Sequence, residues 1–201
     1  MKRFFTLLLL AIFVTGIQAQ QKVTLRDIAQ GTYRAQGISG LKPMLDGEHY
    51  TQISSDHKRI VKYSFKTGEE VGTLFDVTTA RDCDLKSFDD YILSPDEKLI
   101  LIQTETKPIY RHSFTAVYYI YNVKNNKMEP LSTGGPQQVP LFSPDGNQIA
   151  FVRNNNIYLV KLLFGNSESQ VTKDGEYNHV LNGIPDWVYE EEFSFNRAFD
   201  F

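Results

Sequence analysis

Ser94-Pro95-Asp96-Glu97, followed by Leu99-Ile100-Leu101-Ile102, is the stretch that decides the fold of this chain. The pattern returns as Ser143-Pro144-Asp145-Gly146 before Ile149-Ala150-Phe151-Val152, and more weakly as Pro43-Met44-Leu45-Asp46-Gly47 before His49-Tyr50-Thr51. The aspartates of the three copies, Asp46, Asp96 and Asp145, stand 50 and 49 residues apart. A period of this length with several short strands per unit indicates a β-propeller.

Short apolar runs alternate with turn residues along the chain. Val117–Tyr121 and Ile157–Val160 suit further strands, because β-branched and aromatic residues favour extended backbone. Asn125-Asn126 and Asn154-Asn155 read as hairpin turns, since Asn tolerates positive φ. No segment after the N-terminus shows a sustained helical period. We therefore expect an all-β protein, with an irregular β-sandwich as the alternative fold.

The repeat count predicts an incomplete ring. Three units are present, whereas a closed propeller needs at least four blades. We expect residues 41–201 to form an incomplete β-propeller domain, preceded by an N-terminal segment over residues 20–40. The chain is then a fragment or truncated product of a longer protein.

The first residues read as a secretory signal peptide over residues 1–19. Lys2 and Arg3 give a positive start, the run from Phe4 to Ile17 is almost wholly apolar, and Ala19 offers a small residue for cleavage. The run is too short to span a bilayer comfortably, and no later stretch is long and apolar enough, so we expect no membrane span. The expected location is periplasmic or secreted.

Composition excludes several classes of function. The formal net charge of −3 gives no sign of a nucleic-acid partner. The single cysteine, Cys83, allows no internal disulfide and reads as a small buried hydrophobe. The four histidines show no metal-ligand spacing, and no glycine-rich loop could hold a phosphate. We expect neither a metal nor another cofactor.

Two long connections interrupt the repeat. One lies between the second and third strands of the second unit and carries Arg111; the other follows the third unit and carries Glu190-Glu191-Glu192. Strands of a blade alternate in direction, so both connections should emerge at one end of the propeller. Insertions that gather on one face of a repeat protein usually mark its binding face.

The acidic triplet suits a cationic ligand if something holds its carboxylates together. Trp187, Val188, Tyr189 and Phe193 flank it, and we expect these side chains to pack around the carboxylates. Neighbouring carboxylates repel one another, and an ammonium group offers three donors to them. Arg111 could balance this charge or bind a carbonyl of the same ligand. A solvated acidic surface and a structural arginine are the alternatives.

The segment Asp186-Trp187-Val188-Tyr189-Glu190-Glu191-Glu192 resembles the signature of the dipeptidyl peptidase IV family, in the prolyl oligopeptidase clan of serine peptidases. Arg111-His112-Ser113-Phe114 is similar to the matching segment of an earlier blade. The resemblance implies an eight-bladed propeller that caps an α/β-hydrolase domain, and removal of Xaa-Pro or Xaa-Ala dipeptides from free N-termini. It assigns the substrate's α-ammonium to Glu191 and Glu192, and the carbonyl region to Arg111. It also allows a homodimer of the complete protein.

The chain departs from that family in its chemistry. It contains no Gly-x-Ser-x-Gly elbow, and we expect the C-terminal α/β-hydrolase domain and all catalytic residues to be absent. The leading hypothesis is the N-terminal part of an exported serine dipeptidyl peptidase that supplies the clamp for the substrate's N-terminus. A non-catalytic propeller that binds peptides or proteins is the alternative. A TolB-like structural propeller without a clamp is a third, disfavoured by the two specific segments.

Overall fold

The structure is a computed structural model that describes residues 22–35, 37, 39–163 and 165–201. It divides into two compact units, Met1–Ser39 and Gly40–Phe201. The predicted signal peptide lies outside the described residues and stays a prediction. Within the described ranges, no helix has both the length and the apolar character needed to cross a membrane.

The described part of the first unit holds one short helix, α2 (Leu25–Gln30). Thr24 caps its N-terminus in a reciprocal pair with Asp27, and Gly31 ends it at φ +66°. The sequence shows no sustained helical period after the N-terminus, so this helix was not predicted. A helix of six residues is too short to show a period, although its caps are readable in the sequence.

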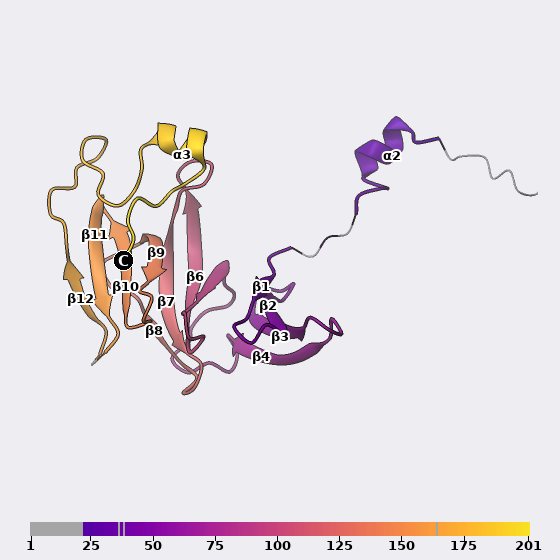
Figure 1. The fold of residues 1–201 in the computed structure, drawn as a ribbon, viewed down its shortest axis with the longest axis horizontal. Coiled ribbons are helices and arrows are strands. Elements are labelled where there is room, and N and C mark those ends of the chain that lie inside the picture. Colours follow the sequence, from indigo (N-terminus) through magenta and orange to yellow (C-terminus); the bar gives the residue numbers. More distant parts are fainter. Residues whose placement is uncertain (1–21, 36, 38, 164) are drawn as a thin grey trace, which may run out of the picture. The chain divides into compact units, whose positions relative to one another are not determined.

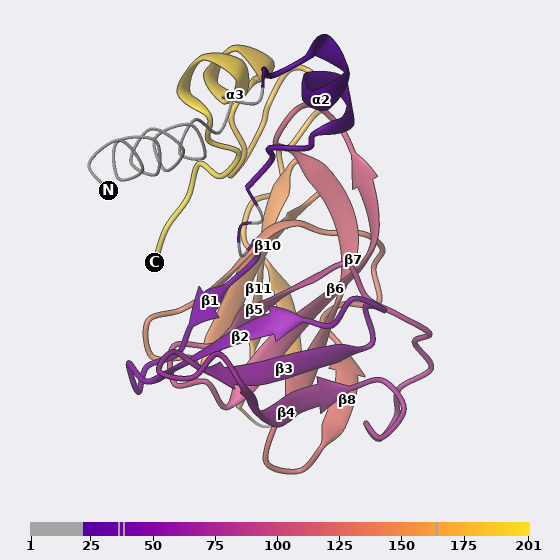
Figure 2. The same cartoon turned by 90° about the vertical axis from the view of Figure 1, so that its right-hand side faces the viewer.

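The second unit contains three four-stranded antiparallel sheets, each built from consecutive strands. Blade 1 comprises β1 (Lys42–Pro43), β2 (His49–Ile53), β3 (Arg59–Ser64) and β4 (Glu70–Asp76). Blade 2 comprises β5 (Asp90–Leu93), β6 (Leu99–Pro108), β7 (Phe114–Asn122) and β8 (Lys127–Pro130). Blade 3 comprises β9 (Gln138–Phe142), β10 (Gln148–Arg153), β11 (Asn156–Lys161) and β12 (Ser167–Gln170). Figures 1 and 2 show the three sheets following one another, which confirms the predicted partial β-propeller.

The repeated turn joins the first two strands of each blade, as its spacing predicts. Ser94 and Ser143 each accept a hydrogen bond at Oγ from the backbone N–H five residues later, both at 2.9 Å. Met44 occupies this place in blade 1 and keeps only the backbone bond to His49, at 2.9 Å. Ser54 repeats the serine pattern at the next turn of blade 1, between β2 and β3, where the sequence analysis missed it.

The core lies between successive blades, because both faces of the middle sheet are covered. Along β6, Ile100 and Ile102 join the cluster shared with blade 1, whereas Leu101 joins the cluster shared with blade 3. All three side chains are fully buried. The alternation follows from the two-residue period of a strand and explains why this stretch reads as a continuous apolar run.

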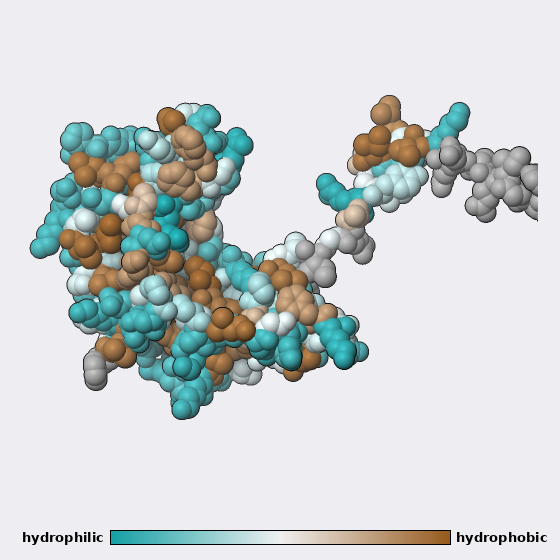
Figure 3. Space-filling view, in the orientation of Figure 1, coloured by the Kyte–Doolittle hydropathy of each residue, from teal (hydrophilic) through white to brown (hydrophobic). Residues whose placement is uncertain are grey.

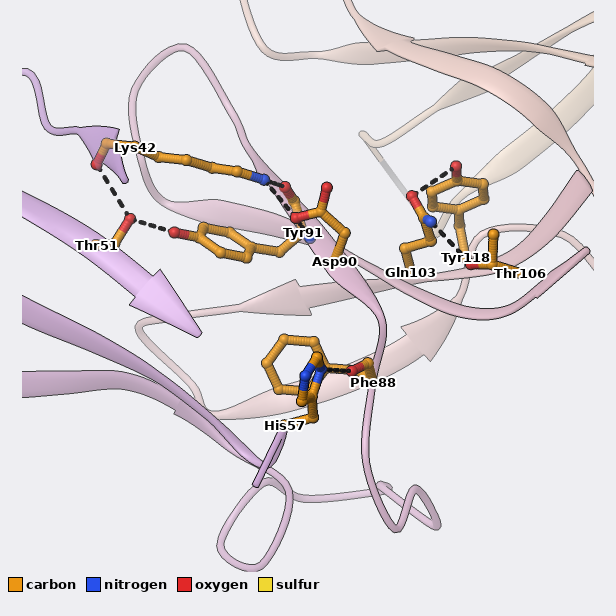
Figure 4. Close-up of polar contacts among 9 residues, drawn as sticks. All are labelled: Lys42, Thr51, His57, Phe88, Asp90, Tyr91, Gln103, Thr106 and Tyr118. Atoms are coloured by element: carbon orange, nitrogen blue, oxygen red, sulfur yellow. Dashed lines mark hydrogen bonds and ion pairs between the residues drawn. The ribbon is translucent and has the colours of Figure 1, made fainter. Parts of the chain in front are cut away.

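Polar contacts also join blades 1 and 2 (Figure 4). The ammonium group of Lys42 lies 2.6 Å from Asp90, bonds the carbonyl of Tyr91 and sits 4.0 Å from the centre of the Tyr91 ring. The hydroxyls of Tyr91 and Thr51 lie 2.6 Å apart. Burial raises the pKa of Tyr91 to about 12, so its hydroxyl stays protonated and bonded.

Cys83 is half-buried and packs against the cluster between blades 1 and 2. Burial raises the pKa of its thiol, and the carboxylate of Asp84 adds to this rise. A protonated thiol is a poor nucleophile, so Cys83 packs as a small hydrophobe, although it is half-buried where the sequence predicted a buried residue.

Candidate functional site

The acidic triplet lies on a second short helix, α3 (Trp187–Phe193). Asp186 caps its N-terminus by accepting a hydrogen bond from the backbone N–H of Tyr189 at 3.1 Å. Ser194 closes the other end in the left-handed region at φ 59°. This helix was not predicted either, because seven residues give less than two full turns over which to recognise a period.

Arg111 and Glu191 form an ion pair between blade 2 and the connection that follows blade 3. The Nε of Arg111 lies 3.0 Å from Oε2 of Glu191. The arginine side chain is 72% exposed and the glutamate side chain 19% exposed. Figure 1 shows α3 above the end of β6 where the loop to β7 begins. The two long connections therefore emerge at one end, as the alternation of strands predicts.

The three consecutive glutamates occupy different surroundings. Glu190 is buried, with 2% exposure, and its Oε1 accepts hydrogen bonds from the backbone N–H groups of His112 at 2.7 Å and Ser113 at 2.8 Å. Glu192 is exposed and forms no ion pair with any residue that the structure describes. Among the described residues, Glu191 is thus paired with Arg111, and Glu192 has no charged partner.

The expectation that aromatic side chains pack around these carboxylates is wrong. Trp187, Tyr189 and Phe193 are 55%, 52% and 65% exposed, and Figure 3 shows apolar and polar residues mixed over the surface of α3. The Tyr189 ring contacts the Phe193 ring, with centroids 5.5 Å apart, because residues four apart meet on one helix face. The carboxylates of Glu190 and Glu191 are held instead by contacts with the connection between β6 and β7, residues 109–113, called here the Arg111 loop.

Two opposing effects act on the pKa of Glu190. Burial of the carboxylate raises it, but hydrogen bonds from Ser113 and from the backbone of His112 outweigh that effect and hold the pKa below its usual value. Glu190 therefore stays ionised at neutral pH. Since this charge is already satisfied by the loop, it is not available to a ligand.

Asn196, just beyond α3, reaches the same loop. Its Nδ2 donates a hydrogen bond to the carbonyl of His112 at 2.9 Å. Glu190 and Asn196 thus bond the Arg111 loop from two sides, and the sequence analysis gave neither residue a separate role. Nothing in a run of three glutamates distinguishes the one that will be buried.

A hollow of about 1290 Å³ lies beside α3. Ile109, Tyr110, Tyr177, Trp187 and Phe195 are among the residues that line it. Arg111, Glu191 and Glu192 are not among the residues that line the hollow, although their chain neighbours Tyr110 and Glu190 are. Across the described ranges, no group of three or more His, Cys, Asp or Glu side chains could hold a metal ion.

Known proteins resemble this chain in sequence. The human relative named prolyl endopeptidase FAP is 34% identical over 171 residues, covering 85% of this chain and 21% of the relative. A probable dipeptidyl-aminopeptidase B of Emericella nidulans is 49% identical over 111 residues, covering 52% of this chain and 12% of the relative. The chain therefore spans about a fifth or less of the length of these relatives.

A solved structure also matches. The crystal structure of Porphyromonas gingivalis dipeptidyl peptidase 4 superposes with a TM-score of 0.79 and 43% sequence identity. The match covers 89% of this chain and 26% of that one. Residues 94–201 match the family described as the dipeptidyl peptidase IV (DPP IV) N-terminal region. Since these residues make up more than half of the chain and include β6 to β12 together with α3, the chain belongs to the dipeptidyl peptidase IV N-terminal region family.

Proposed function

We propose that this chain supplies the clamp for the substrate's N-terminus in an exported serine dipeptidyl peptidase, which removes Xaa-Pro or Xaa-Ala dipeptides from free N-termini. The observation that carries the proposal is the ion pair between Arg111 and Glu191, beside the unpaired carboxylate of Glu192. The pair and Glu192 together bring one cation and two carboxylates to one end of the blades. A peptide's first residue offers the complementary groups, an α-ammonium and a carbonyl.

The charges around the pair favour a cationic group. Arg111 balances one of the two available carboxylates, which leaves a net negative site. An α-ammonium is mostly charged at neutral pH, given a reference pKa of about 7.7–8.0. It carries three donors, enough to bond Glu191 and Glu192 together. Arg111 is 72% exposed, so its guanidinium is free to turn from Glu191 towards a substrate carbonyl.

A free N-terminus would then be required for binding. A peptide that enters by its middle, or whose N-terminus is acetylated, offers no ammonium and leaves the two carboxylates desolvated and unpaired. The clamp thus excludes endopeptidase substrates by leaving charges without partners. Cleavage itself needs a nucleophile, and this sequence has no Gly-x-Ser-x-Gly elbow. We expect the 201-residue chain alone not to hydrolyse Gly-Pro or Ala-Pro chromogenic substrates.

The test is a cycle of two perturbations on the full-length protein that carries this segment. The first perturbation is Glu191→Gln or Glu192→Gln, and the second is N-acetylation of an Ala-Pro chromogenic substrate. Each alone should lower kcat/KM on the order of 30-fold or more, because the bound substrate covers the ammonium–carboxylate pair and each perturbation leaves one side of it unmatched. Together they should lose little more than either alone.

A matched control is Glu176→Gln, which removes an exposed carboxylate, paired with His179 at 3.2 Å, from the connection between β12 and α3. This variant should keep both kcat/KM and the acetylation effect. Losses that simply multiply in the Glu191 or Glu192 cycle would show that these carboxylates do not bind the N-terminus. Binding of free peptides without any hydrolysis by the full-length protein would favour the non-catalytic peptide-binding propeller.

A further inference from the structure

The loop that carries Arg111 needs something other than the ion pair to fix it. The Arg111 side chain is 72% exposed, and ion pairs in solvent contribute little to holding a conformation. Within the loop, the backbone N–H of Ile109 bonds the carbonyl of Ser113 at 2.9 Å and closes a tight turn. This closure leaves the N–H groups of His112 and Ser113 to find partners outside the loop.

Glu190 provides those partners. One oxygen of its carboxylate accepts from both N–H groups, at 2.7 Å and 2.8 Å, and 78 residues separate Glu190 from His112 in the chain. Hydrogen bonds to an ionised acceptor are stronger than neutral ones, and at 2% exposure water competes little for them. A carboxylate buried this deeply must keep its donors, since an unpaired buried charge is costly.

Asn196 bonds the backbone carbonyl of His112, whose N–H bonds Glu190. Its amide donates to the carbonyl of His112 at 2.9 Å, so the N–H and the C=O of the residue next to Arg111 are both bonded by side chains from the α3 segment. The helix that presents Glu191 thus also fixes the backbone that presents Arg111. The two halves of the pair are set by one connected network.

We infer that Glu190 and Asn196 are positioning residues that fix the backbone at Arg111 relative to Glu191 and Glu192, so that both sides of the clamp are in place before a peptide N-terminus arrives. The inference rests on the proposed function and assigns Glu190 a task distinct from that of its two neighbours. Glu190 does not touch the substrate, because its carboxylate is buried and occupied by the loop. It acts through Arg111.

The kinetic test combines Glu190→Leu with Arg111→Ala in the full-length protein. Leucine keeps the volume but cannot accept a hydrogen bond, so Glu190→Leu should lower kcat/KM for an Ala-Pro substrate on the order of tenfold, within the coupling range of one hydrogen-bond network. Arg111→Ala should then add little further loss. Glu190→Gln keeps an acceptor oxygen and should retain kcat/KM to within about threefold.

The matched control is Glu168→Leu, which breaks a partly buried pair with Arg153 at 2.7 Å in blade 3. This variant perturbs structure without touching the loop, so Arg111→Ala should cost as much in its background as in the parent protein. If Arg111→Ala costs equally much in the Glu190→Leu background, Glu190 is merely structural and the inference is wrong.

A second measurement covers the case in which Glu190→Leu fails to fold. Asn196→Asp removes the donor to the His112 carbonyl, and amide hydrogen exchange at Arg111, His112 and Ser113 reports the opening of the loop. Exchange there should accelerate about tenfold in Asn196→Asp and stay unchanged in Glu168→Leu. Unchanged exchange in Asn196→Asp would overturn its positioning role. If Arg111→Ala and Glu191→Gln leave the preference for free N-termini intact, the proposed function fails instead.

Discussion

The guanidinium Nε of Arg111 lies 3.0 Å from Oε2 of Glu191, although the arginine belongs to a loop of blade 2 and the glutamate to a helix beyond blade 3. The contact spans two blades and creates a charged site that neither blade forms alone. Its energetic role follows from its exposure. A pair this open to water should matter for recognition far more than for folding.

Arg111→Ala should therefore separate binding from stability. We expect the free energy of unfolding to change by less than about 1 kcal/mol, because exposed ion pairs contribute in that range. The KM for an Ala-Pro substrate should rise in the full-length protein. Lys98→Ala is the control, since Lys98 lies outside the site. Its side chain is 76% exposed, and its ammonium group pairs with Asp96 at a distance of 2.8 Å. Lys98→Ala should change the free energy of unfolding as little as Arg111→Ala does, and it should leave KM unchanged. If the two variants had the same KM, Arg111 would not bind the substrate.

Tyr91→Phe should weaken the junction of blades 1 and 2. The Tyr91 side chain is fully buried, and its hydroxyl lies 2.6 Å from the Thr51 hydroxyl. Losing this hydrogen bond should cost about 0.5–1.5 kcal/mol in urea denaturation. Tyr119→Phe is the matched control, because its ring also packs against this core while its hydroxyl bonds no other described residue. Equal effects of the two variants would show that the bond does not join the blades.

The repeated turns should depend on their serine hydroxyls. Ser143 Oγ donates to Asp145 at 2.6 Å and accepts from the backbone N–H of Gln148 at 2.9 Å. Ser143→Ala leaves that partly buried backbone group without its side-chain partner, so we expect a loss of about 1–2 kcal/mol in thermal denaturation. Ser55→Ala, at an exposed position of the related turn in blade 1, should change stability by less than about 0.5 kcal/mol. A Ser143→Ala variant as stable as Ser55→Ala would contradict the prediction.

The turn of blade 2 should make stability depend on acid. Hydrogen bonds from Lys98 and Ser94 lower the pKa of Asp96 to about 2. A carboxyl whose pKa is lower folded than unfolded stabilises the fold above its unfolded value of about 3.9, and this contribution disappears as the pH falls towards the folded value. Asp96→Asn should therefore destabilise the protein at pH 6. The difference in stability between the variant and the parent protein should disappear between about pH 4 and pH 2.

Melting curves of both proteins at several pH values check this expectation. The gap between them is the informative quantity, because His49 also lowers the pKa of Asp46 and adds its own acid dependence to both proteins. A gap that stays constant from pH 6 to pH 2 would show that Asp96 does not contribute through its charge.

Much of the blade structure was readable because its signals are local. The Asn154-Asn155 turn was predicted from residues that tolerate positive φ, and both adopt it, at 50° and 57°. The two short helices were missed because the sequence analysis relied on a repeating apolar pattern. Their caps, Thr24 with Asp27 in the first helix and Asp186 in the second, were the available signals.

The sequence by itself determined the repeat, the strands and the end of the blades at which Arg111 and the acidic triplet emerge. These follow from turn chemistry and from the alternation of strand direction, both of which act over a few residues. Only the tertiary structure decided which of the three glutamates is buried, which is paired with Arg111 and which is exposed. Neighbouring residues of a helix point about 100° apart, and the docking of the Arg111 loop selects the one that is buried. That contact puts Glu190 beneath the loop and Glu191 against Arg111, and leaves Glu192 open.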